Sequence, residues 1–237
     1  MNIEAFSTSF RMSYKLIEDI GLLRQKGIKV LHKDDVSPEF KRISQKRDYF
    51  LTYKTAIKNF DYDFLLEDQS IFQFSYTCVE GAIFNFRYAF FQNPQEYVSY
   101  QDFLLSHDLI NDFQTVEDVG AMFYSEYEQF LTEQQINTSS TSIRYDLDFK
   151  NYSPLIHSTS HIHIGNYNDI RIPCDKIITP YKFTLFVLKH CYYYKWKELI
   201  SQDGMLSKIG LDTAKNSCTK LQERNWSSDE KYELFIT

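Results

Sequence analysis

The stretch that decides the fold is SIRYDLDFKNYSPLIHSTSHIHIGNYNDIRIP, residues 142–173. Three of its segments, 142–149, 159–165 and 169–173, alternate apolar and polar side chains, a pattern typical of half-buried β-strands. The Asn-Tyr-Asn sequence at 166–168 indicates a tight turn between the last two segments. We therefore expect three neighbouring strands of a sheet here.

The same stretch contains three of the six histidines in the chain, His157, His161 and His163. Side chains two residues apart on a strand point to the same side, so His161 and His163 should share one face while Ile162 packs into the core. His157 lies four residues before His161 and can fold over that face. The histidines therefore form the centre of a candidate site.

Charged residues flank the histidines on the neighbouring segments. Arg144, Asp146 and Asp148 share a face of their strand by the same rule, and Arg171 opens the third segment. If the strands pair, imidazoles, a carboxylate and guanidinium groups can converge, although the sequence alone does not set the register. The predicted site residues are His157, His161, His163, Asp146, Arg144 and Arg171.

Three chemistries fit this set of side chains. Neutral imidazoles beside a carboxylate can bind a divalent metal, zinc or manganese, with His157, His161 and His163 as ligands. Without a metal, two histidines can act as base and acid in RNA cleavage, with Asp146 orienting one imidazole and an arginine holding the phosphate. The cluster can also bind a phosphate or nucleotide without reaction. The spacing H-x3-H-x-H does not choose among them, and histidines bonded only to main-chain carbonyls are the structural alternative.

The composition limits the class of protein. The 237 residues include 20 Phe and 18 Tyr but only 7 Gly, which speaks against a Gly-rich phosphate loop or a dinucleotide fingerprint. We find neither an export signal at the N-terminus nor an apolar run long enough to span a membrane. The four cysteines are scattered, with no C-x-x-C pair. These features predict a cytoplasmic protein with reduced thiols.

The charge is distributed unevenly along the chain. Residues 1–60 contain 12 Lys/Arg against 7 Asp/Glu, whereas residues 61–136 contain 14 Asp/Glu against Arg87 alone. The basic first part, with its KRISQKR sequence at 41–47, can approach nucleic acid. The acidic 61–136 region can bind a basic protein partner, or both regions can simply be solvated faces.

The remaining segments complete the predicted architecture. The runs IFQFSYTCV (71–79) and AIFNFRYAFF (82–91) alternate and predict an antiparallel hairpin around Glu80–Gly81. We expect helices at 9–26, closed by Gly27, at 37–60, at 94–106 after an Asn93–Pro94 cap, at 115–135 and at 179–201, with a last edge strand at 232–237. The fold class is α+β, one domain with an antiparallel sheet of about five to six strands flanked by helices. Its parts are a basic helical region 1–60, a core 65–200 and a C-terminal extension 205–237.

A series of short motifs resembles a bacterial family known as a domain of unknown function. The motifs are IFQFSY (71–76), IRYD (143–146), HSTSHIHIG (157–165), RIP (171–173) and TPYKF (179–183). That resemblance implies no activity. The Arg-Tyr-Asp strand before a histidine-rich strand is also loosely similar to small bacterial toxin proteins, which implies a stress or phage-defence setting in which such proteins often act as nucleases.

Two functions follow as expectations. The first is a toxin or phage-defence nuclease that acts on a phosphodiester, most plausibly RNA, at the histidine cluster. The second is a non-catalytic partner subunit or binding module of a defence or stress complex that uses its acidic surface to bind a protein.

Overall fold

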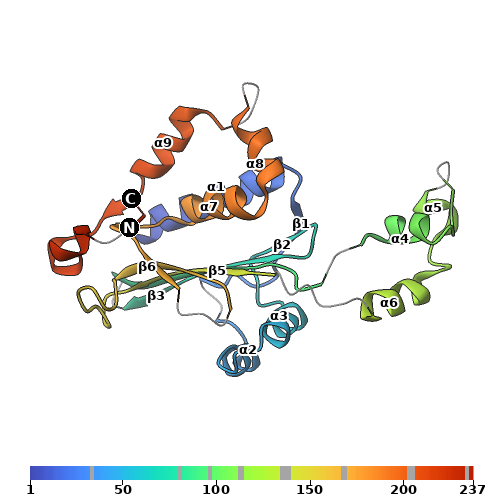
Figure 1. Cartoon of the computed structure of the whole chain (residues 1–237), viewed down its shortest axis with the longest axis horizontal. Helices are drawn as coiled ribbons and strands as arrows, with labels where there is room; N and C mark the ends of the chain where they lie inside the picture. Colours follow the sequence, from blue (N-terminus) through green and yellow to red (C-terminus); the bar gives the residue numbers. More distant parts are fainter. Residues whose placement is uncertain are drawn as a thin grey trace. The chain divides into compact units, whose positions relative to one another are not determined.

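The computed structural model describes residues 1–32, 35–79, 82–95, 98–111, 115–133, 140–166, 170–201, 206–232 and 235–236. The chain divides into two compact units, of which unit 1 consists of residues 1–92 and 141–237 and unit 2 of residues 93–140. Figure 1 shows the helices and strands with the labels used below. Whether the chain folds as one cooperative domain stays a prediction.

Unit 1 is built on an antiparallel sheet in which every strand pairs with the next one along the chain. Within the described residues its order is β1-β2-β3-β4-β5-β6-β7. The α+β class is confirmed, and the sheet has seven strands because two short ones precede the predicted hairpin. The strands are β1 (Leu23–Lys26), β2 (Phe64–Leu66), β3 (Ile71–Val79), β4 (Ala82–Phe91), β5 (Ser142–Asp148), β6 (Ser160–Ile164) and β7 (Arg171–Pro173).

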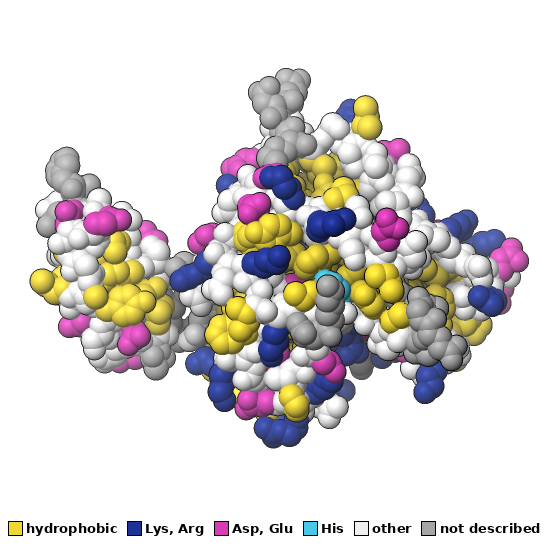
Figure 2. Space-filling view, turned by 180° about the vertical axis from the view of Figure 1, so that it is seen from behind, with side chains coloured by type: hydrophobic (Ala, Val, Ile, Leu, Met, Phe, Trp, Pro, Cys, Tyr) yellow, Lys and Arg dark blue, Asp and Glu magenta, His cyan; other side chains and the backbone are white. Residues whose placement is uncertain are grey.

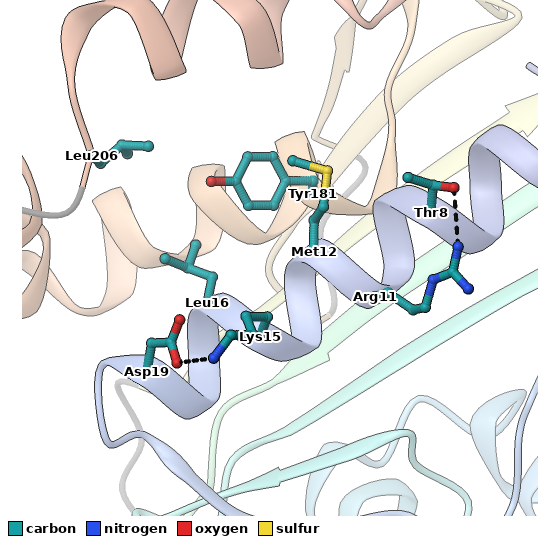
Figure 3. Close-up of a pocket in the computed structure, with 8 residues that line it drawn as sticks. All are labelled: Thr8, Arg11, Met12, Lys15, Leu16, Asp19, Tyr181 and Leu206. Atoms are coloured by element: carbon teal, nitrogen blue, oxygen red, sulfur yellow. Dashed lines mark hydrogen bonds and ion pairs between the residues drawn. The ribbon is translucent and has the colours of Figure 1, made fainter.

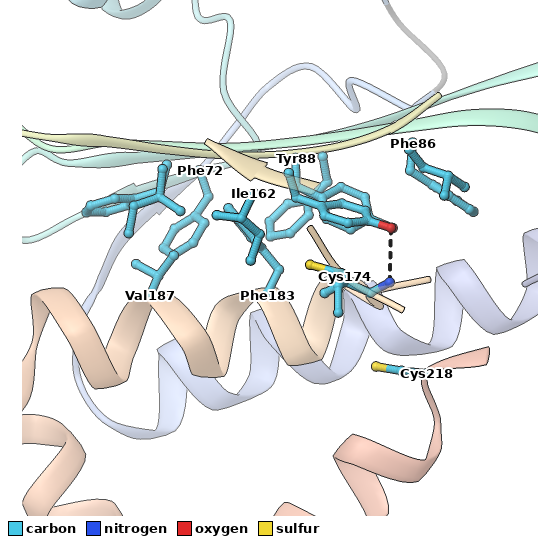
Figure 4. Close-up of a cluster of buried hydrophobic side chains, with 14 of the residues drawn as sticks. Phe72, Phe86, Tyr88, Ile162, Cys174, Phe183, Val187 and Cys218 are labelled. Atoms are coloured by element: carbon cyan, nitrogen blue, oxygen red, sulfur yellow. Dashed lines mark hydrogen bonds between the residues drawn. The ribbon is translucent and has the colours of Figure 1, made fainter. Parts of the chain in front are cut away.

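One face of the sheet packs against helices α1 (Ile3–Asp19) and α7 (Pro180–Cys191) (Figure 1). Aromatic side chains dominate this core, and Phe183 of α7 lies 5.7 Å from the ring of Tyr88 and 6.1 Å from that of Phe74. Figure 4 shows the rings of Phe183 and Tyr88 between the helices and the strands. The buried Tyr145 hydroxyl lies 3.0 Å from Ser160 Oγ and accepts the backbone N–H of Ile178, so a polar group in the core has its partners.

Among the described helices, α2 (Pro38–Ser44) and α3 (Tyr49–Lys58) cover one end of the other face of the sheet (Figure 1). Phe40 and Tyr53 of these helices cluster with Ile71 and, at the edge of the cluster, with Phe91. Because alternate residues of a strand share a face, Arg87 lies on the same face as Phe91, beyond the helices. This face therefore changes from apolar and covered at one end to polar at the other.

The helices differ from the prediction where local caps interrupt the apolar periodicity. The predicted helix 9–26 runs from Ile3 to Asp19 and ends before Gly21, whose φ of 67° is unfavourable for other residues. Gly27 does not close it but follows β1, where a Cβ would stand 1.9 Å from the carbonyl oxygen of Tyr62. The predicted helix 37–60 is two helices, because Asp48 caps α3 by accepting the N–H of Leu51.

The predicted helix 179–201 is also divided in two. Helix α8 (Tyr193–Ile200) follows α7 directly, and Tyr192 at the junction has the non-helical ψ of 54°. The Tyr192 hydroxyl donates to Asp68 at 2.8 Å, which fixes the side chain at this bend. After α8 come α9 (Lys208–Asn216), β9 (Thr219–Lys220) and two 3-10 turns at Glu223–Asn225 and Asp229–Tyr232. Strand β9 pairs with β8 (Lys176–Ile177), which lies between β7 and α7 in the chain.

Unit 2 contains the acidic helices α4 (Tyr100–Ser106), α5 (Val116–Val119) and α6 (Tyr124–Glu133). The predicted helix 94–106 was wrong at its start, because Ser99 rather than Asn93 caps α4, with Ser99 Oγ 3.0 Å from the N–H of Asp102. The predicted helix 115–135 is broken at Gly120, which has a φ of 53°. The apolar side chains spaced along this segment nevertheless pack into the core of this unit, namely Val116, Val119, Phe123, Tyr127 and Phe130.

Several turn predictions fall outside the described residues. These are Glu80–Gly81 of the hairpin, residues 167–168 of the next turn, and half of the predicted last strand 232–237. In the described half, Tyr232 ends a 3-10 turn and Ile236 forms a parallel bridge with Cys174. None of the helices in the described ranges combines the length and apolar character needed to cross a bilayer.

Candidate functional site

The register of the sheet places the predicted site residues side by side on its polar face. Asp146 of β5 lies opposite His161 of β6, and Arg144 lies opposite His163. Across the next pair of strands His163 lies opposite Arg171 of β7. On the other side Asp146 lies opposite Arg87 of β4. Four adjacent strands therefore contribute to one row of polar side chains.

Asp146 is the centre of this row and binds three donors. Its Oδ2 accepts Arg144 Nε at 2.7 Å and lies 3.3 Å from His163 Nε2, and its Oδ1 accepts Arg87 Nε at 3.0 Å. Burial acts to raise the pKa of Asp146, but the His163 hydrogen bond and the Arg144 and Arg87 charges outweigh it and hold that pKa well below its usual range. The carboxylate is therefore ionised at any physiological pH.

His161 is held in one protonation state by the chain around it. Its Nδ1 lies 2.7 Å from the carbonyl oxygen of Ser158, which can only accept, so Nδ1 carries the proton. Burial lowers the pKa of His161 to about 4, and the residue is 3% exposed. At neutral pH the ring is thus uncharged and its Nε2 presents a lone pair.

The three histidines form a continuous row of rings. The His157 and His161 centroids are 5.1 Å apart and those of His161 and His163 are 4.8 Å apart, both in edge-to-face arrangement. His157 comes from the loop before β6, where Ser153 and His157 form an isolated bridge, and its buried Nδ1 has no hydrogen-bond partner among the described residues. An unsatisfied buried nitrogen beside two other imidazoles is unusual in a purely structural cluster.

The loop that carries His157 and the Ser158 carbonyl is anchored by a residue far away in the sequence. Glu230, which is 0% exposed, accepts the Tyr152 hydroxyl at 2.8 Å and the Ser227 N–H at 2.7 Å. Its second oxygen lies 3.4 Å from the Ser158 hydroxyl. The C-terminal extension thus helps to place the carbonyl that orients His161.

A divalent metal fits this donor set poorly. Asp146, His161 and His163 each offer one ligand atom, and the three atoms lie within 4.8 Å of one another. However, both oxygens of Asp146 already accept from guanidinium groups, so a cation would have to displace an arginine and enter beside two fixed positive charges. The predicted metal-ligand role of the histidines stays a prediction, and the electrostatics favour an anion.

The structure brings five of the six predicted residues into direct contact, namely Arg144, Asp146, His157, His161 and His163. The sixth residue, Arg171, is exposed and lies opposite His163 in the pairing of β6 with β7. Sequence reasoning missed Arg87 and Glu230. Arg87 could have been found as the single basic residue of the acidic 61–136 region, on the polar side of an alternating strand.

Comparison with known proteins identifies the family. A family model described as "Uncharacterized conserved protein (DUF2290)" matches residues 19–234. The chain therefore belongs to that family, as its motif series predicted. No curated protein and no solved structure matches the chain.

Proposed function

We propose that this member of the DUF2290 family binds a phosphodiester at the histidine cluster and cleaves it, with RNA as the substrate. The observation that carries the proposal is the charge around Asp146. Two arginines bind the Asp146 carboxylate and a third, Arg171, lies opposite His163, so three guanidinium groups stand against the carboxylates of Asp146 and Asp148, while the neutral His161 adds no charge. The row therefore has an excess of positive charge beside a nitrogen lone pair, which suits a phosphate and a proton acceptor.

His161 and His163 can each carry out one of the two proton transfers of RNA cleavage. His161 Nε2 can take the proton of the ribose 2′-hydroxyl, whose oxygen attacks phosphorus as the bond to the 5′-oxygen breaks. The leaving 5′-oxygen gains a proton from His163. Because Asp146 binds Nε2–H of His163, the mobile proton of that ring is on Nδ1. The products are a 2′,3′-cyclic phosphate and a 5′-hydroxyl.

Exposed arginines can hold the phosphate without leaving Asp146. The Arg87 side chain is 67% exposed and that of Arg144 is 42% exposed, and each uses its Nε for the carboxylate. The remaining nitrogens of both guanidinium groups can donate to phosphate oxygens.

The same face of the sheet offers a path for the rest of an RNA strand. The KRISQKR sequence at 41–47 belongs to α2 and the turn after it, and its Lys and Arg side chains are exposed. Lys and Arg side chains gather where α2 and α3 lie, at the bottom of Figure 2. Backbone phosphates bind such a surface without sequence preference.

The test is cleavage of a fluorogenic RNA oligonucleotide in EDTA. We expect a 2′,3′-cyclic phosphate product, no cleavage of the 2′-deoxy oligonucleotide, and a loss of rate of about 10²- to 10⁴-fold in His161→Ala and in His163→Ala. His107→Ala, at an exposed histidine of unit 2, is the matched control and should keep the full rate. Equal cleavage by all three variants would contradict the proposal, as would activity that appears only with added zinc or manganese.

The setting that we propose is a bacterial toxin or phage-defence system in the cytoplasm. All four cysteines are free thiols, which fits a reducing compartment. Growth arrest on expression, relieved by the folded His161→Ala/His163→Ala double variant, would support this role. Unchanged growth with either protein would count against it.

The second candidate function is that of a partner subunit. Residues 93–140 contain nine Asp/Glu and no Lys or Arg. On this unit Met122 is 72% exposed and Tyr124 is 48% exposed, and Figure 2 shows yellow side chains bordered by magenta ones at its far left. A basic protein surface with an apolar centre would match it. Titration with a Lys-rich amphipathic peptide tests this: Met122→Glu should abolish binding, while the exposed Ile156→Glu in unit 1 should leave it intact.

A further inference from the structure

A second candidate site lies on the face of the sheet opposite the histidines. A cavity of about 980 Å³ is bounded by β5, β6 and β7, by α7, α8 and α9, and by Ile236 near the C-terminus. Its size lies at the upper end of the range for small-molecule sites, about 300–1,000 Å³. It shares no lining residue with the histidine cluster.

The floor of this cavity is aliphatic. Successive strands β5, β6 and β7 each contribute one isoleucine to it, Ile143, Ile164 and Ile172, and Ile236 adds a fourth. Leu185 of α7 and Leu211 of α9 extend the same lining. A surface of branched aliphatic side chains gains free energy when a hydrocarbon chain displaces water from it.

The rim of the cavity is cationic. Four lysines line it, Lys182 and Lys189 from α7 and Lys208 and Lys215 from α9, against the single carboxylate of Asp212. Within the described part of the chain, none of the four lysines makes an ion pair. Burial, with added repulsion from Lys215 and Lys189, lowers the pKa of Lys182. Like charges collected around an apolar floor cost stability unless an anion binds among them.

A neighbouring cavity shows that this arrangement is not general in the protein. The smaller cavity of about 410 Å³ lies along α1, with Tyr181 and Leu206 on its far side (Figure 3). It also has two cationic residues, but Lys15 pairs with Asp19 at 2.5 Å and Arg11 donates to Thr8 at 3.3 Å. Its cations already have partners, whereas the four lysines of the larger cavity form no ion pair with any residue that the structure describes.

We propose that the 980 Å³ cavity binds an aliphatic anion, with its hydrocarbon chain on the isoleucine floor and its carboxylate or phosphate head among the four lysines. The lining distinguishes this ligand from two simpler ones. A bare phosphate would leave the floor exposed to water, and a neutral lipid would leave the lysines without a counter-charge.

The test is isothermal titration calorimetry of the full chain with four probes below their micelle concentrations. Laurate and dodecyl phosphate should bind one to one, whereas dodecyl maltoside, with a neutral head, should bind at least tenfold more weakly and inorganic phosphate should not bind. Tighter laurate indicates a fatty-acid-like ligand and tighter dodecyl phosphate a phospholipid-like one; both support the proposal. Equal affinity for dodecyl maltoside, or no binding of either anion, would overturn it.

A pair of matched variants tests the lysine rim. Lys189→Gln/Lys215→Gln changes two exposed rim residues and should weaken laurate binding about tenfold, since each partly screened charge pair contributes modestly. Arg11→Gln/Lys15→Gln, on the smaller cavity, should bind laurate like the unchanged protein. Unchanged affinity of the rim variant would show that the lysines do not hold the head group.

A measurement on the unchanged protein makes the conclusion independent of any variant. Reductive methylation should modify Lys182 and Lys215 more slowly when laurate is bound, while Lys15 reacts at the same rate with and without it. Equal rates at all three lysines would contradict binding in this cavity. None of these readouts depends on RNA cleavage, so the two proposals can fail separately.

Discussion

The two faces of the central sheet are made from alternate residues of the same strands, yet they use opposite means of stabilisation. On β5, Tyr145 is buried against the aromatic core, and its neighbour Asp146 is surrounded by arginines and a histidine. The aromatic face gains stability from apolar burial and depends little on pH. The polar face depends on partner groups and on their protonation. A substitution should therefore act through packing on one face and through charge on the other.

The largest effect is expected on the aromatic face. Phe183→Ala removes a fully buried ring that contacts Phe74 and Tyr88, and should lower the free energy of unfolding by about 3–5 kcal/mol. Urea unfolding at neutral pH measures it. The control is Tyr194→Ala, at a ring that is 81% exposed, which should change the midpoint little. A small loss in Phe183→Ala would mean that this core can rearrange around a cavity.

The next effect belongs to His161 and depends on pH. Its pKa of about 4 in the folded state lies below the ordinary value of about 6.5, so the unfolded chain takes up the proton first as the pH falls. The stabilisation is complete above about pH 6.5 and is lost as the pH falls towards 4, by at most about 3 kcal/mol.

Urea unfolding of the unchanged protein and of His161→Gln between pH 4 and 7 measures this difference. The variant should lose less stability over that range. The comparison of the two proteins is needed because burial raises the pKa of Asp63 to about 7, so protonation of Asp63 increases stability as the pH falls. This contribution is the same in both proteins and cancels in their difference. Parallel curves would mean that His161 titrates normally.

A smaller effect is expected for Asp146→Asn. The substitution leaves Arg87 and Arg144 without their carboxylate and should cost about 1–3 kcal/mol at neutral pH. Because the folded pKa of Asp146 is lowered, its contribution is present above about pH 4 and is lost only in strong acid. In urea unfolding the difference between the variant and the unchanged protein should therefore shrink as the pH falls from 4 towards 2. A constant difference down to pH 2 would point to packing instead of charge.

The smallest effect is expected at an exposed ion pair, which serves as the reference for the buried charges around Asp146. Asp19→Asn breaks an ion pair with Lys15 on the surface of α1, where the lysine side chain is 68% exposed. Solvent screens such a pair, so the urea midpoint should not change measurably. A clear loss would mean that surface charges matter here as much as the buried row around Asp146.

The sequence predicted the parts of the fold that depend on local periodicity. The alternation in 71–91 and 142–173 yielded the hairpin, the later strands and the shared face of His161 and His163. It could not reveal β1, because Leu23 continues the apolar spacing of the preceding helix and only the pairing with Leu66 makes it a strand. Helix ends were missed at Asp48, which caps a second helix inside the predicted helix 37–60, and at Ser99, which caps α4 in place of the expected Asn93–Pro94 cap.

The sequence predicted five of the side chains that meet around Asp146 and His161, but it missed Arg87 and Glu230 and did not give the arrangement of the group. Arg87 and Asp146 are 59 residues apart in the sequence, so their contact depends on the register between β4 and β5. The contact of Glu230 with Tyr152 spans 78 residues and joins two irregular segments, for which no periodicity exists. Such contacts follow from the packed fold and not from a local pattern.

The pairing of β4 with β5 has a consequence for how the gene product could be shortened. The last pair of that ladder is Phe91 with Ser142, and Gln92 donates its N–H to the Thr141 carbonyl at 3.1 Å, so the chain leaves and returns at one point. Residues 93–140 thus occupy the place of a hairpin turn. Lengthening a loop adds an entropy cost that grows only logarithmically. Replacing this excursion with a two-residue Asn-Gly turn should preserve the face that carries the histidine cluster and remove the acidic residues 93–140, so a single deletion would separate the two candidate functions.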